Sequence, residues 1–312
     1  MKVAVVGAGA WGKNIVRTLH ELGALAAVVD VSPAIREQIA SSYPGVTVSD
    51  EISSIAGNDI KAVAVATSAP THYGVVKTLL EAGEDVFVEK PMALSVAEAE
   101  ELAGLAERGG RVLMVGHLLL YQPAVQWLKT ELGSGALGRV VGIHQTRLGL
   151  GRARKVENVL WSLGVHDVAV ALYLAGSSPE SVMVSGQRII QPGIEDDVHL
   201  EMGFGDGLRA YLHCSWLWPE RERRTVVVGS RGILVYNELE QTITLHRKSI
   251  DSALANVDDG CEVVYQGSGE PLKLEMQHFL DCIGSRATPI SHGRSGVEVV
   301  RVLQTASERL TL

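Results

Sequence analysis

The segment that most constrains the fold is a glycine-rich turn near the N-terminus. The turn reads Gly7-Ala8-Gly9-Ala10-Trp11-Gly12, follows a short β-branched run at 2–6, and precedes apolar residues at helical spacing. A strand, a G-x-G-x-x-G turn and a helix in this order can bind a pyrophosphate, because the helix amides face it and the missing Cβ atoms allow its approach. The residues predicted to contact a dinucleotide here are Gly7, Gly9, Ala10, Trp11 and Gly12.

An acidic residue follows this turn at the spacing of a dinucleotide-binding domain. Asp30 stands at the end of a second apolar run at 26–31. A carboxylate there accepts hydrogen bonds from both ribose hydroxyls and repels a 2′-phosphate, so the sequence favours NAD over NADP. A tight turn with a surface aspartate is the alternative, and methyltransferases and flavoproteins share the turn.

Apolar runs and helical patterns alternate through the first third of the chain. Ser95 and Glu98 form a capping box at the start of a helix that runs to about Arg108. This alternation predicts an α/β fold with a doubly wound parallel sheet, a Rossmann domain at 1–118. Its further strands are expected at 61–67, 85–89 and 111–116.

The pattern changes in the second part of the chain. Apolar and polar residues alternate from Leu208 to Trp216, which indicates a sheet with two unlike faces. The Gly205-Asp206-Gly207 turn joins this strand to 198–204 as an antiparallel hairpin. We therefore predict an α+β domain with a mostly antiparallel open sheet at 119–312. Outside this hairpin we expect a strand at 139–147 and helices at 160–174, 272–283 and 297–310.

Composition limits the partners of the chain. The 312 residues carry a net charge of −8, so there is no electrostatic footprint for nucleic acid or an anionic membrane. Three cysteines far apart suggest neither a disulfide framework nor a zinc site, and a cytoplasmic compartment is expected. No run approaches the roughly 20 apolar residues that span a bilayer. We expect a small-molecule substrate and further copies of the chain as partners.

The segment Glu89-Lys90-Pro91 directly follows the strand at 85–89. Ligands of open α/β sheets bind outside the carboxyl ends of the strands, so Lys90 is expected beside the cofactor, in a segment stiffened by Pro91. Near a cationic nicotinamide the pKa of its ammonium should fall, which lets it polarise or deprotonate a substrate hydroxyl. A solvated lysine at a strand end is the alternative.

Two histidines are further candidates. His166 lies on the predicted helix at 160–174 beside Asp167, where it is either a satisfied core group or a base that faces a pocket. His72 begins the helix after the strand at 61–67 and could equally be a cap-region residue. The other histidines have no metal-ligand spacing along the chain, so no metal site is predicted.

A basic stretch precedes the helix that carries His166. It contains no acid before Glu157, and its cations are Arg147, Arg152, Arg154 and Lys155. Arginine forks there would suit a diphosphate on the substrate, whereas a solvated loop is the alternative. A second group of arginines, at 221–224, is interpreted as surface.

Together these features resemble the Gfo/Idh/MocA oxidoreductase family over essentially the whole chain. The segments that carry the resemblance are the glycine turn, Asp30, Thr67 with Thr71-His72, Glu89-Lys90-Pro91, Gly116-His117 and Gly164-x-His166-Asp167. The resemblance implies nicotinamide-dependent oxidation of sugar or cyclitol hydroxyls, and a second domain whose open sheet forms dimer or tetramer contacts. It also implies that Thr67, His72 and Glu89 contact NAD, and that Lys90 and His166 are the catalytic pair.

The segments 121–125, 147–152 and 158–161 look most like the branch of the family that acts on nucleotide-linked sugars, including enzymes that oxidise the 3-hydroxyl of UDP-N-acetylglucosamine or its uronic acid. The substrate residues that this resemblance implies are Lys90, Arg147, Arg152, Asn158, Ser162 and His166. Ser162 stands where the family usually has aspartate, so Asp167 or the substrate compensates, or the activity is altered or lost.

The expected mechanism aligns NAD and the sugar between the two domains. His166 takes the proton of a ring hydroxyl and Lys90 stabilises the developing alkoxide, or the two exchange roles. Two other functions stay open: a dehydrogenase of a free sugar or inositol, and an NAD-binding sensor or inactive accessory subunit.

Overall fold

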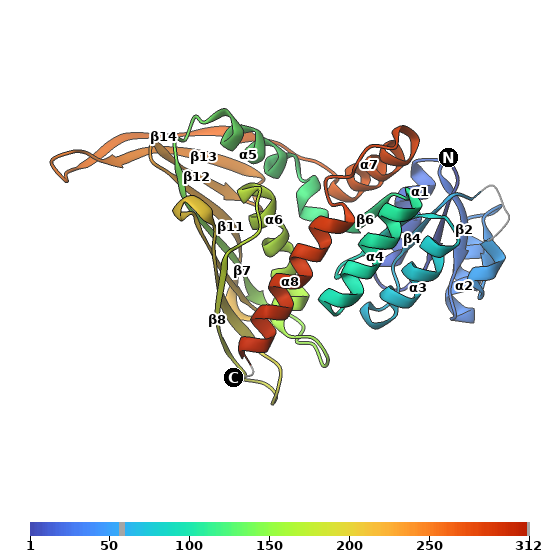
Figure 1. The fold of residues 1–312 in the computed structure, drawn as a ribbon. Coiled ribbons are helices and arrows are strands. Elements are labelled where there is room, and N and C mark those ends of the chain that lie inside the picture. The colour runs from blue at the N-terminus through green and yellow to red at the C-terminus, as the bar shows by residue number, and fades with distance from the viewer. Residues whose placement is uncertain (56–59, 311–312) are drawn as a thin grey trace. The chain divides into compact units, whose positions relative to one another are not determined.

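The computed structural model describes residues 1–55 and 60–310, and the chain divides into two units (Figure 1). The first unit comprises Met1–Leu118 and Glu270–Arg301, and the second comprises Leu119–Gly269 and the chain from Val302 onward. The first boundary between the units therefore falls after residue 118. Residues 270–301 belong to the first unit, although the sequence analysis placed them in the second. This segment belongs to the first unit because its helix α7 (Pro271–Ser285) packs there: the ring of Phe279 lies 5.9 Å from the ring of Phe87 in the first sheet.

The first unit is built on a six-stranded parallel sheet in the order β3-β2-β1-β4-β5-β6. Its strands are β1 (Val3–Val6), β2 (Leu25–Val29), β3 (Thr47–Ser49), β4 (Ala62–Val65), β5 (Asp85–Glu89) and β6 (Leu113–Gly116). The strand order reverses beside β1, and in open α/β sheets ligands bind at such a point, outside the carboxyl ends of the strands.

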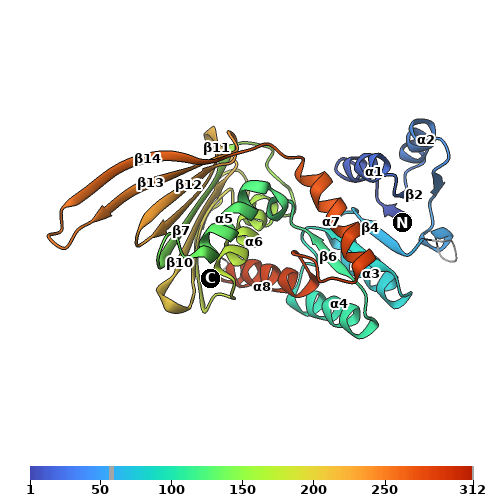
Figure 2. The ribbon, with the colours of Figure 1, turned by 90° about the horizontal axis from the view of Figure 1, so that it is seen from above.

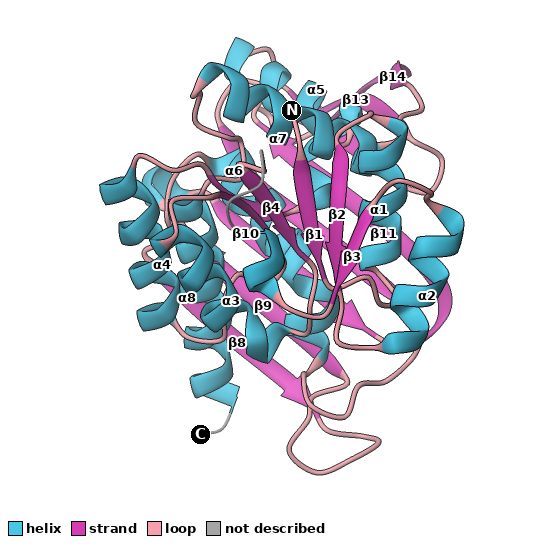
Figure 3. Cartoon of the chain, turned by 90° about the vertical axis from the view of Figure 1, so that its right-hand side faces the viewer, coloured by secondary structure: helices cyan, strands magenta, loops and turns pink. Residues whose placement is uncertain are grey.

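Helices cover both faces of this sheet. They are α1 (Gly12–Glu21), α2 (Pro33–Ser42), α3 (Ala69–Glu81) and α4 (Val96–Gly109). Figures 2 and 3 show α1 and α2 on one face and α3 and α4 on the other, which buries β1, β4, β5 and β6 along their whole length. The predicted N-cap at Ser95 is confirmed, since Glu98 N donates to Ser95 Oγ at 3.2 Å, while the Glu98 carboxylate accepts from Leu94 N at 3.3 Å.

The second unit is built on an eight-stranded sheet in the order β14-β13-β12-β11-β7-β10-β9-β8, with β7 and β10 as its parallel pair. The predicted hairpin around 205–207 is confirmed as β9 and β10. The strands are β7 (Val140–Leu150), β8 (Ser181–Gln187), β9 (Asp197–Gly203), β10 (Arg209–Ser215), β11 (Leu217–Gly229), β12 (Gly232–Asn237), β13 (Thr242–Ile250) and β14 (Asn256–Gln266).

The two faces of this second sheet differ, as the alternation from 208 to 216 predicts. The helices α5 (Pro123–Ser134) and α6 (Val165–Ala175) lie on one face (Figure 2), and α8 (Gly293–Leu310) ends beside β8, where Arg309 donates to the carbonyl of Val182. Leu200 and Leu212 are buried, whereas His199 and Tyr211 are exposed on the opposite face. None of the helices in the described ranges is long and apolar enough to cross a membrane.

Candidate functional site

The glycine turn leaves room for a phosphate. Gly7 has a φ of +90°, and a Cβ on Gly12 would lie 2.0 Å from the carbonyl oxygen of Gly7, so both positions require glycine. A Cβ on Gly9 would meet no described atom within 4 Å. The turn is therefore closed on its inner side and open over Gly9, at the start of α1, where a helix N-terminus binds a pyrophosphate.

Asp30 directly follows β2 and holds this turn. Its Oδ2 accepts a hydrogen bond from Ala8 N at 2.8 Å, and its Oδ1 accepts one from Ser32 N at 2.9 Å. A carboxylate has about four acceptor positions, so two acceptors remain for ribose hydroxyls. The turn and Asp30 together fit NAD.

Glu89 connects the glycine turn to the segment that carries Lys90. The Trp11 indole Nε1 donates to Glu89 Oε1 at 2.5 Å, and Lys90 N donates to Glu89 Oε2 at 3.2 Å. A Cβ on Gly116 would lie 3.1 Å from the same carboxylate, so this glycine makes the space for it. Burial raises the pKa of Glu89 to about 7 despite these two donors.

The raised pKa of Glu89 makes stability depend on pH. Between its ordinary value of 4.5 and about 7, the folded chain holds a proton that the unfolded chain has lost, so this contribution to stability falls as the pH rises. The variant Glu89→Gln lacks this pH dependence. The difference in free energy of unfolding between the variant and wild type should therefore shift in favour of the variant between pH 4.5 and pH 8, by up to roughly 3 kcal/mol. Urea unfolding across this pH range measures the difference. A pH-independent difference, or the same trend in the exposed control Glu81→Gln, would contradict the assignment.

Thr67 and His72 lie at the same edge of the sheet, and each bonds within the first unit. Thr67 Oγ1 accepts from Thr71 Oγ1 at 2.8 Å. His72 Nδ1 lies 2.8 Å from the carbonyl oxygen of Pro91, and His72 Nε2 lies 3.1 Å from that of Thr67. Because His72 is 1% exposed, it joins the loop after β4 to the cis Lys90-Pro91 peptide, and a positioning role fits it better than direct contact with NAD.

Lys90 sits among buried groups that respond to its charge. Burial and the ammonium of Lys90 lower the pKa of His117 to about 3, and burial with Lys90 also lowers the pKa of His72. Neither ring nitrogen of His117 has a hydrogen-bond partner among the described residues. Both histidines are therefore neutral near pH 7, and Lys90 supplies the positive charge at this end of β5.

In the second unit, His166 lies in the first turn of α6. A five-residue π-helix, Leu160–Gly164, directly precedes it, so the helix predicted at 160–174 consists of two different segments. Single π-helical turns are rare and frequent at functional sites. The Nδ1 atom of His166 is buried, and Ser162 Oγ accepts a hydrogen bond from Arg154 Nε at 3.3 Å.

The structure corrects the expectation for Arg147. This residue lies inside β7, which continues three residues beyond the predicted strand end; it is 7% exposed and donates two hydrogen bonds to Asp167 and one of 2.8 Å to Glu238. A buried guanidinium matched by two carboxylates is not accessible to a substrate diphosphate. Arg147 instead holds α6 to the sheet, and Asp167 faces Arg147 rather than replacing the aspartate missing at Ser162.

Asn158 also bonds inside the second unit. Its Nδ2 donates to Glu195 Oε2 at 2.8 Å, and its Oδ1 accepts from Trp161 N at 3.1 Å. These bonds fix the start of the π-helix. The structure therefore gives Asn158 a positioning role, and the expected contact with substrate does not follow from its geometry.

A pocket of about 400 Å³ in the second unit gathers arginines from two parts of the chain. Beside Ser162 and Trp216 it is lined by Arg152, Arg154, Arg221 and Arg223. The sequence analysis interpreted the second pair as surface, and Arg221 is exposed, but β11 pairs with β7 and places the half-buried Arg223 opposite Arg147. The sequence contains one signal for this placement: Arg221 and Arg223 are two positions apart, which puts both side chains on the same face of a strand.

Two family models match the chain. Residues 1–117 match the model described as oxidoreductase family, NAD-binding Rossmann fold, and residues 125–235 match the GFO/IDH/MocA C-terminal domain. An inositol 2-dehydrogenase from Acidothermus cellulolyticus is 35% identical over 244 residues, which is 68% of this chain and 70% of that protein. The chain belongs to the Gfo/Idh/MocA oxidoreductase family.

One further relative is similar to the chain over nearly its full length. The UDP-N-acetylglucosamine 3-dehydrogenase of Acidithiobacillus ferrooxidans is 25% identical over 308 residues, 96% of this chain and 94% of that protein. A solved structure of that enzyme, GnnA, has a TM-score of 0.88 at 23% identity, covers 99% and 97% of the two chains, and shows the shared fold. This Gfo/Idh/MocA chain binds NAD in its Rossmann domain and is an NAD(P)-dependent oxidoreductase that acts on CH–OH groups.

Proposed function

We propose that this chain is an NAD-dependent dehydrogenase that oxidises a ring hydroxyl, at C3, of a nucleotide-linked sugar. The observation that carries the proposal is the pocket with four arginines beside Ser162. Guanidinium groups bind phosphate oxygens in pairs, whereas a free sugar or inositol offers no anion to match them. The full-length similarity to a UDP-N-acetylglucosamine 3-dehydrogenase supports the nucleotide and the carbon.

Lys90 and His166 are the proposed catalytic residues. NAD, when bound, supplies the hydride acceptor. His166 takes the proton of the reacting hydroxyl, and Lys90 donates a hydrogen bond to the developing alkoxide. The ion pair between Arg147 and Asp167 fixes the helix that carries His166, while Ser162 adds no negative charge beside it. Lys90 as the base is the alternative assignment.

A comparison of substrates tests this function. NADH absorbance should report a kcat/KM at least about 100-fold higher with UDP-N-acetylglucosamine than with N-acetylglucosamine or myo-inositol, because charged hydrogen bonds contribute about 1.5–3 kcal/mol each. Arg152→Ala and Arg221→Ala should each raise KM for the UDP-sugar about tenfold or more, with kcat little changed.

Arg224→Ala is the matched control, since Arg224 lies on the same strand and is exposed outside the pocket. Equal kcat/KM for free and UDP-linked sugars would favour the inositol-type dehydrogenase instead. A chain that binds NAD but yields no NADH with any of these substrates, and gains activity with Ser162→Asp, would support the sensor or inactive-subunit alternative.

A further inference from the structure

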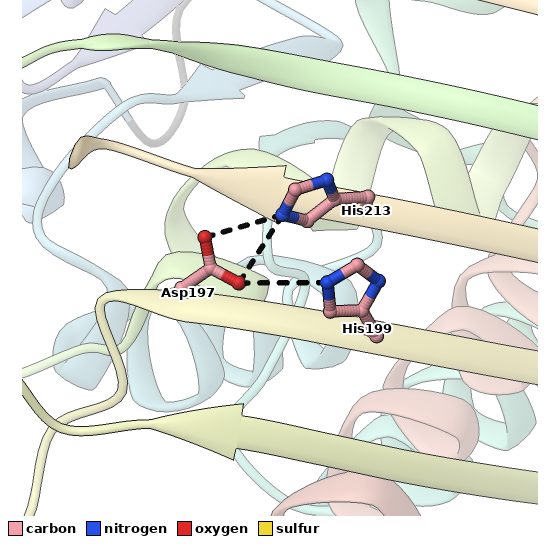
Figure 4. A group of neighbouring side chains, drawn as sticks. All are labelled: Asp197, His199 and His213. Atoms are coloured by element: carbon pink, nitrogen blue, oxygen red, sulfur yellow. Dashed lines mark hydrogen bonds and ion pairs between the residues drawn. The ribbon is translucent and has the colours of Figure 1, made fainter. Parts of the chain in front are cut away.

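The exposed face of the second sheet carries a histidine and carboxylate group far along the chain from the residues proposed for catalysis. His199 on β9 stands directly opposite His213 on β10. Asp197 lies two residues before His199, so the period of two puts its side chain on the same face. Figure 4 shows the carboxylate of Asp197 beside both imidazole rings.

The distances among these three side chains suit a shared cation. His213 Nε2 lies 3.1 Å from Asp197 Oδ2, and His199 Nε2 lies 3.7 Å from Asp197 Oδ1. The imidazole rings stack with centroids 3.9 Å apart, and one ligand atom from each residue lies within 4.8 Å of the others. Ligands at about 2.0–2.2 Å from a tetrahedral ion are about 3.4 Å apart, so small side-chain rotations would complete the geometry.

We propose that Asp197, His199 and His213 bind a divalent transition metal ion, with Zn²⁺ as the best chemical match. Two imidazoles and a carboxylate are a ligand set that leaves at least one coordination position open to water. A groove of about 440 Å³, lined in part by His199 and His213, lies beside the group and leaves space for that water. Trp218 packs edge-on against the His213 ring, with the ring centroids 5.4 Å apart.

The charges around the group favour a cation. Arg209, four residues before His213 on β10, has Glu201 3.7 Å away, so its charge is matched on the same face. On the neighbouring strands His144 stacks on Tyr211, and β8 contributes Met183 and Ser185 to the groove.

The sequence analysis predicted no metal site because it searched for ligand spacing along the chain. The contact between His199 and His213 arises only from the register of two antiparallel strands. Two zinc ligands on one helix are separated by three to five residues in the sequence. Two ligands on neighbouring strands have no fixed separation in the sequence, so a search for ligand spacing does not find them.

A zinc titration of the full chain tests this site. After removal of metal with a chelator, calorimetry should give one Zn²⁺ per chain, and His199→Ala or His213→Ala should weaken its binding at least about tenfold. Asp197→Asn is the second variant if an alanine variant does not fold. Co²⁺ added in place of Zn²⁺ should give a visible absorption band that these variants lose.

His144→Ala is the matched control, because His144 lines the same groove outside the three ligands. Zinc binding that is unchanged in His199→Ala, or weakened equally in His144→Ala, would show only adventitious binding to surface histidines and would overturn the proposal. The titration needs neither NAD nor substrate, so its outcome is separate from that of the proposed dehydrogenase activity.

Discussion

Replacing Lys90 with methionine is expected to lower kcat by about three orders of magnitude while leaving the affinity for NAD close to that of wild type. Methionine keeps a long apolar side chain but removes the ammonium, whose charge acts on His72, Glu89 and His117 at the end of β5. Initial rates of NADH formation give kcat and KM, and calorimetry gives the NAD affinity. The expected signature is a fall in kcat at nearly constant NAD affinity.

Lys77→Met is the control for the loss of a lysine. Lys77 lies on α3 in the same unit and pairs with Glu101 at 2.6 Å, away from the end of β5. Its replacement should leave turnover unchanged. If Lys90→Met turned over within about threefold of wild type, the proposed role of Lys90 would be wrong.

The pH profile decides which residue is the base. If His166 takes the proton, the acidic limb of the kcat/KM profile belongs to its imidazole and disappears in His166→Gln. If Lys90 takes the proton, the acidic limb of the kcat/KM profile remains in His166→Gln, and the variant only has a lower kcat/KM at every pH.

Local patterns predicted the parts of the fold that depend on local physics. The glycine turn, the capping box at Ser95 and the alternation from 208 to 216 each specify backbone geometry within a few residues, and the structure contains the corresponding turn, helix and strand. The short edge strand β3 was missed because three residues, Thr47–Ser49, carry too little periodicity to recognise.

The candidate site was predicted less completely because its decisive contacts join distant segments. Arg147 pairs with Asp167 and Glu238, which follow it by 20 and 91 positions. Only the pairing of β7 with β11 brings Arg221 and Arg223 to the pocket that contains Arg152. A charge pattern along the chain shows that arginines are present, but not which of them are already neutralised by buried carboxylates.

The buried ion pair predicts the largest effect on stability. Asp167→Asn should lower the free energy of unfolding by about 3 kcal/mol or more, because it leaves the buried guanidinium of Arg147 with Glu238 as its remaining partner. Urea unfolding at pH 7 measures the loss. Asp258→Asn breaks the exposed pair with Lys248 and should change stability little, since both groups are solvated.

A double variant separates the value of the pair from the cost of an orphaned charge. Arg147→Met with Asp167→Leu removes both buried charges, and Glu238, whose side chain is 18% exposed, can turn its carboxylate to water. The double variant should therefore recover most of the stability lost in Asp167→Asn, because apolar side chains of similar volume replace buried ion pairs at little cost. If it unfolds as easily as Asp167→Asn, the pair itself stabilises the second unit, and its charges are needed to hold α6 and His166 on the sheet.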